Sequence, residues 1–128
     1  LREGKEIAIV AIGSTVYPSL AAAGKLANEG IDSTVINSRF IKPLDGELLC
    51  EIAAKTKKII TVEENVLMGG FGSAVLELLE EKGIFGVTVK RLGIGSEFVA
   101  HATQAELRKA HGIDEEGIAR AVRQVIGL

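Results

Sequence analysis

Two carboxylates and an amide, Glu63, Glu64 and Asn65, stand where an apolar run ends and a glycine cluster begins. Paired carboxylates could perform general acid–base catalysis if both reached the same substrate. Adjacent residues of a strand point to opposite faces of a sheet, so Glu63 and Glu64 are not expected to act as one dyad. Three roles remain open for these polar residues: hydrogen bonding within their loop, contact with a neighbouring domain, or binding of a small ligand.

Other side chains that could perform chemistry are few and scattered. His101, His111 and the single Cys50 do not have the spacing of a metal site, so we expect no metal ligands. Ser14 lacks the G-x-S-x-G elbow of a serine hydrolase. We therefore expect no catalytic residue in this chain.

The glycine clusters could be taken for phosphate cradles. Gly70-Phe71-Gly72 and Gly93-Ile94-Gly95 each begin a G-x-G-x-x-G motif, but Val75 and Phe98 stand where its last glycine belongs. Neither cluster completes the dinucleotide fingerprint, and there is no Walker sequence. We expect tight backbone packing there and no cofactor-binding residue.

The elements that position these residues alternate along the chain. Apolar runs predict strands over 7–12, 33–36, 57–62 and 87–92, and the positions of leucine and valine predict a helix over 70–82. Further helices are predicted after residue 15, after residue 45 and after residue 114. Such alternation predicts one α/β domain over residues 1–128, a three-layer α/β/α fold with a mostly parallel sheet.

Several helix ends carry recognisable signals. Ser14 or Thr15 is predicted to cap the first helix, and Gly24 within that helix predicts close packing against the sheet. Thr103-Gln104-Ala105-Glu106 is a capping box that predicts a short helix to residue 110. Asp114 and the acidic residues after it are predicted to start the last helix.

Composition excludes several classes of protein. Hydrophobic residues make up 47% of 128 residues, the net charge is −2, and tryptophan is absent, so we expect a folded domain without a nucleic-acid surface. No apolar run approaches the roughly 20 residues of a membrane span. One cysteine is consistent with a cytoplasmic protein. The chain starts at Leu1 and its one methionine is Met68, so we expect it to be cut from a longer polypeptide, with a processed start as the alternative.

The loop Arg39-Phe40-Ile41-Lys42-Pro43-Leu44-Asp45 places two cations beside apolar residues. One interpretation is a structural loop in which Asp45 caps the next helix. The other is contact with another domain or subunit, because arginine is favoured at such interfaces.

Four segments together resemble a known family. They are Ala11-Ile12-Gly13-Ser14, residues 37–45, residues 61–79, and His111-Gly112-Ile113-Asp114 with Gly117-Ile118-Ala119. They are similar to the third, C-terminal domain of the transketolase-like thiamine diphosphate enzymes, and within these to the deoxyxylulose phosphate synthases. The chain departs from those synthases at residues 93–97, where their proline and aspartate are missing.

The resemblance implies a sheet order of second, first, third and fourth strand, and an antiparallel edge strand from residues before the first. It implies a parent enzyme that binds thiamine diphosphate and Mg²⁺ in its first two domains, and converts pyruvate and D-glyceraldehyde 3-phosphate. This chain lacks the Gly-Asp-Gly cofactor motif. The implied role is structural, with the other two domains of its own chain and a homodimer partner as contacts. We expect the interface residues to be Arg39, Phe40, Lys42, Glu64, Asn65, Met68 and Phe71.

Two alternatives stay open. The chain could be the equivalent domain of a transketolase or of a 2-oxo-acid dehydrogenase β chain, which would dock a carrier subunit. It could also be a free-standing module that binds a ligand at the switch point of the sheet, between Gly13-Ser14-Thr15 and Glu63-Glu64-Asn65.

Overall fold

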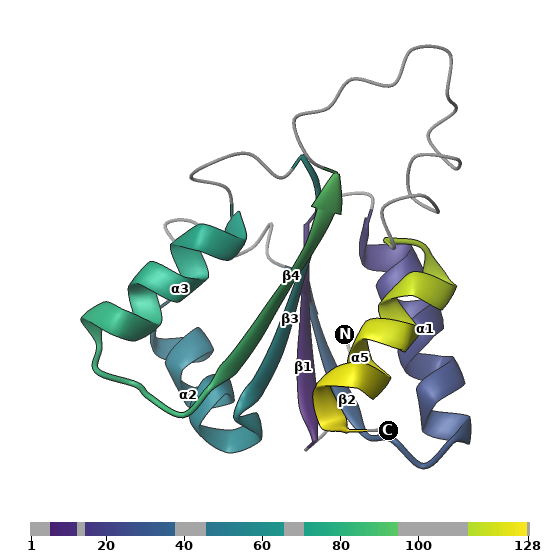
Figure 1. The fold of residues 1–128 in the computed structure, drawn as a ribbon, viewed down its shortest axis with the longest axis horizontal. Coiled ribbons are helices and arrows are strands. Elements are labelled where there is room, and N and C mark those ends of the chain that lie inside the picture. Colours follow the sequence, from purple (N-terminus) through teal and green to yellow (C-terminus); the bar gives the residue numbers. More distant parts are fainter. Residues whose placement is uncertain (1–5, 13–14, 38–45, 66–70, 95–112, 128) are drawn as a thin grey trace.

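The computed structural model describes residues 6–12, 15–37, 46–65, 71–94 and 113–127. Strands and helices alternate along the chain, as the sequence predicts (Figure 1). In chain order they are β1 (Ile7–Ala11), α1 (Val16–Asn28), β2 (Ser33–Asn37), α2 (Gly46–Thr56), β3 (Lys58–Asn65), α3 (Phe71–Glu81), β4 (Thr88–Ile94) and α5 (Glu115–Ile126).

The four strands form a parallel sheet in the order β2-β1-β3-β4, which confirms the predicted order. Helices α1 and α5 cover one face of this sheet, and α2 and α3 cover the other (Figure 1). The described residues therefore form the predicted α/β/α sandwich. Connections in such a fold return each helix antiparallel to its strands, so helix N-termini gather where the strands end.

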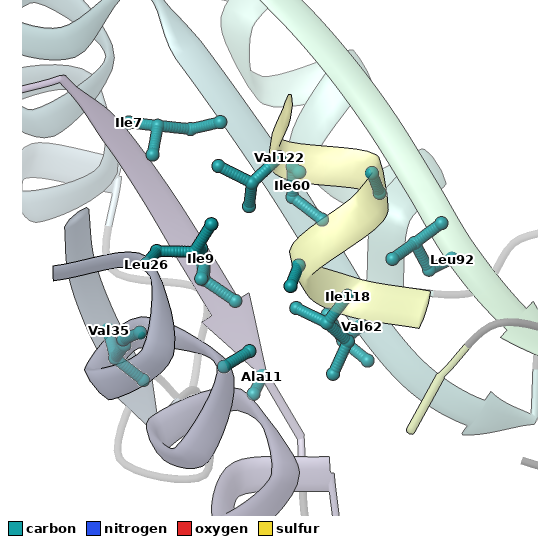
Figure 2. Packing of buried hydrophobic residues seen from close by; sticks show 14 of the residues in the cluster. Ile7, Ile9, Ala11, Leu26, Val35, Ile60, Val62, Leu92, Ile118 and Val122 are labelled. Carbon is teal, nitrogen blue, oxygen red and sulfur yellow. The ribbon is translucent and has the colours of Figure 1, made fainter. Parts of the chain in front are cut away.

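Strand β1 is buried on both faces, since all five of its residues have 0% exposure. Ile7, Ile9 and Ala11 point to the layer of α1 and α5, where Leu26, Ile118 and Val122 pack against them (Figure 2). Ala8 and Val10 point to the opposite layer and pack with residues of α2 and α3. This double burial explains why β1 is a continuous apolar run rather than an alternating one.

Helix α5 joins the sheet through one apolar face, as predicted. Asp114 caps it, because its side-chain oxygen accepts a hydrogen bond of 2.8 Å from the N–H of Gly117. At its other end Arg123 donates two hydrogen bonds, of 2.9 and 2.5 Å, to the Glu29 carboxylate after α1. An ion pair between Lys25 and Glu116 adds a second tie between the two helices.

Strand β3 is longer than the sequence predicts. The run Glu63-Glu64-Asn65 was expected to form a loop, but it continues the strand and pairs with β4. The pairing shifts register between Glu63 and Asn65, which marks a bulge or irregularity. Polar residues tolerate a strand here because β4 also extends further than predicted, to Ile94, and supplies backbone partners.

The close approach of helix to sheet also differs from the prediction. A Cβ added at Gly24 would meet nothing within 4 Å, so no close packing requires glycine there. At Gly72, in the first turn of α3, an added Cβ would lie 2.7 Å from the Arg91 side chain and 2.8 Å from Thr61 Oγ1. The absence of a side chain at Gly72 thus lets α3 start directly on β3 and β4.

These two glycines give a matched pair of substitutions. Gly72→Ala should destabilise the domain by about 1–3 kcal/mol, because the new methyl group forces Arg91 and Thr61 aside. Gly24→Ala should stabilise it by about 0.5–1 kcal/mol, because alanine costs less than glycine in a helix and has free space. Urea unfolding of both variants measures the difference, and equal free energies of unfolding would contradict the assignment of the close contact to Gly72.

Candidate functional site

The topology brings three of the sequence-predicted interface residues, Glu64, Asn65 and Phe71, to the carboxyl edge of the sheet, where the strands end. Strand β2 ends at Asn37, immediately before the segment that holds Arg39, Phe40 and Lys42. Strand β3 ends at the same edge, and α1 and α3 begin there (Figure 1). Segments far apart in sequence therefore converge on one side of the domain.

The described structure fixes the backbone position of three predicted interface residues. Glu64 and Asn65 are the last residues of β3, and Phe71 is the first residue of α3. Arg39, Phe40, Lys42 and Met68 lie outside the described residues. The assignment of all seven to an interface stays a prediction.

Strands β1 and β3 form the predicted switch point, because they are neighbours whose following helices pack on opposite faces. Thr15 lies at this point and is fully buried. Its hydroxyl is 2.9 Å from the carbonyl oxygen of Val62 and 2.7 Å from that of Ile12, and it accepts a hydrogen bond of 3.0 Å from the Ile12 N–H. The hydroxyl thereby joins the ends of two strands.

Of the two predicted caps of α1, Ser14 lies outside the described residues, and Thr15 takes the N-cap position without a side-chain capping bond. The backbone of Thr15 is in the αR region. The hydroxyl instead contacts the ends of the two strands, at the carbonyl oxygens of Ile12 and Val62. The Val62 carbonyl oxygen accepts a hydrogen bond of 3.0 Å from the Ile12 N–H and one from the Thr15 hydroxyl. In the described part of the switch point, the Thr15 hydroxyl and the backbone groups of Ile12 and Val62 are thus hydrogen-bonded to one another.

Glu63 and Glu64 are adjacent residues of β3, and adjacent residues of a strand point to opposite faces of a sheet, so a catalytic pair is not expected. Glu63 is only 7% exposed and has a partner, and Glu64 follows it in the same strand. Among the described residues, no three His, Cys, Asp or Glu side chains are grouped so that they could hold a metal ion. No helix in the described part of the chain is long and apolar enough to cross a membrane.

A hollow of about 510 Å³ lies at the opposite, amino edge of the sheet. Its lining combines apolar and charged residues from the ends of several elements: Glu6, Glu29, Gly30, Ile31, Thr56, Lys58 and Ile126. Thr56 uses its hydroxyl internally, with partners Ile52 and Lys58, and Glu29 holds Arg123. The hollow thus lies at the edge opposite to the ends of β3, and two of its lining side chains, Thr56 and Glu29, are engaged within the domain.

Tyr17 is not among the residues that the sequence singles out. This side chain is 80% exposed in the first turn of α1, at the carboxyl edge of the sheet. A signal was present, because Tyr17 falls outside the helical series of Val16, Leu20 and Ala23 that predicts the apolar face of α1.

The chain is similar to one domain family and to a set of larger proteins. The family model described as "Transketolase, C-terminal domain" matches residues 1–118. A curated relative from Syntrophus aciditrophicus, a 1-deoxy-D-xylulose-5-phosphate synthase, is 59% identical over 128 residues, which are 100% of this chain and 20% of that protein. The 1-deoxy-D-xylulose-5-phosphate synthase 1 of Geobacter sulfurreducens is 58% identical over 94% of this chain and 19% of its own length.

Solved structures give the same result for the fold. A structure titled "Split gene transketolase, inactive beta4 tetramer" matches 99% of this chain and 41% of its own, with a TM-score of 0.86 and 37% identity. A transketolase from Pichia stipitis matches 98% of this chain and 17% of its own with a TM-score of 0.66, and at 19% identity it supports the fold alone. The chain spans about one fifth of the length of the curated relatives.

The role of the Thr15 hydroxyl can be measured by two substitutions at one position. Thr15→Val keeps the shape and removes the hydroxyl, so it should lower the free energy of unfolding by roughly 1–3 kcal/mol. Thr15→Ser keeps the hydroxyl and should retain most of the stability. If the two variants unfolded at the same urea concentration, the hydrogen bonds to Ile12 and Val62 would not be the cause of any loss.

The Glu29–Arg123 pair should make stability depend on pH. Hydrogen bonds from Arg123 lower the pKa of the Glu29 carboxyl below its ordinary value. The stabilisation is therefore complete above the ordinary glutamate pKa and is lost as pH falls through the lowered one. Glu29→Gln should be less stable than the parent at neutral pH, and the difference should shrink in acid. The check is urea unfolding at several pH values, with Glu77→Gln as an exposed control on α3.

Proposed function

This chain belongs to the transketolase C-terminal domain family, and from that membership we propose that it is the C-terminal domain of a 1-deoxy-D-xylulose 5-phosphate synthase. The observation that carries the proposal is the 59% identity to such a synthase over the whole chain. The parent would convert pyruvate and D-glyceraldehyde 3-phosphate to 1-deoxy-D-xylulose 5-phosphate and CO₂, a precursor of isoprenoids, thiamine and pyridoxal. Identity at this level to two named synthases favours this assignment over a 2-oxo-acid dehydrogenase β chain.

The residues of this chain do not fit the thiamine diphosphate and Mg²⁺ of the proposed parent. The chain lacks the Gly-Asp-Gly motif, and its described residues group no three metal-binding side chains. At the switch point the Thr15 hydroxyl is already engaged with the ends of β1 and β3. We therefore assign no catalytic step to this domain.

The proposed role is assembly of the parent enzyme. The domain would pack against the other two domains of its own chain and against a homodimer partner, in the cytoplasm. The proposed contact residues are Arg39, Phe40, Lys42, Glu64, Asn65, Met68 and Phe71, three of which the described backbone brings to the carboxyl edge. Support comes from the split-gene transketolase with the same fold, which is named as a beta4 tetramer.

Two measurements test this assignment together. The coding region upstream of Leu1 should continue in frame and encode a Gly-Asp-Gly motif and a second α/β domain. The full-length protein should then form 1-deoxy-D-xylulose 5-phosphate from pyruvate and D-glyceraldehyde 3-phosphate when thiamine diphosphate and Mg²⁺ are supplied. A frame that opens within a few codons of Leu1, or a full-length protein without this activity, would overturn the proposal.

If the cofactor is held only by the other domains, the 128-residue chain and the full-length protein should differ in their binding of thiamine diphosphate. Calorimetric titration of the 128-residue chain with thiamine diphosphate and Mg²⁺ should give no binding heat, whereas the full-length protein should bind the cofactor. Micromolar affinity in the 128-residue chain would contradict a purely structural domain. Circular dichroism of the same sample shows that the titrated chain is folded, so that a negative result is meaningful.

A further inference from the structure

We draw no further inference here: the strongest candidate, the hollow of about 510 Å³ at the amino edge of the sheet, carries nothing, because the segment that precedes its lining residue Glu6 lies outside the described residues and nothing in the structure shows what covers it.

Discussion

The burial of β1 on both faces is the constraint on which the rest of the fold depends. Its five residues have no exposure, and they alternate between the two helical layers. A shift of one residue along this strand would exchange the larger Ile7 and Ile9 with the smaller Ala8, so each layer would receive side chains of the wrong volume. The central strand thereby fixes the register of β2 and β3 and the spacing of both helical layers.

Thr15 lies just after this strand, at the start of α1. Strands β1 and β3 are neighbours whose following helices pack on opposite faces, so their carboxyl ends form the switch point of the sheet. In many open α/β sheets such a crevice receives a ligand. Here the hydroxyl of Thr15 and the N–H of Ile12 both reach the Val62 carbonyl. The edge is consequently consolidated by the protein's own groups, which suits a surface for docking better than a pocket.

Most of the fold could be predicted from the sequence because its apolar runs are strong and local. The order of the strands came from the family resemblance, and the apolar face and cap of α5 came from its residue pattern. What failed depends on contacts between distant segments. The extension of β3 through Glu63 requires pairing with β4, and the Thr15 hydroxyl reaches a carbonyl 47 positions away. The structural propensities of single residues do not predict either of these contacts.

Gly24 and Gly72 also show that the sequence alone does not identify contacts between distant segments. A glycine within a helix indicates either close approach or mere tolerance, and the sequence around Gly24 and Gly72 does not separate these cases. In the structure only Gly72 faces atoms at contact distance, namely Thr61 of β3 and Arg91 of β4. The start of α3 is therefore held on the sheet by a steric fit, as the start of α1 is held by Thr15. Both helices therefore begin packed against the carboxyl edge of the sheet, the edge at which we propose that another domain binds.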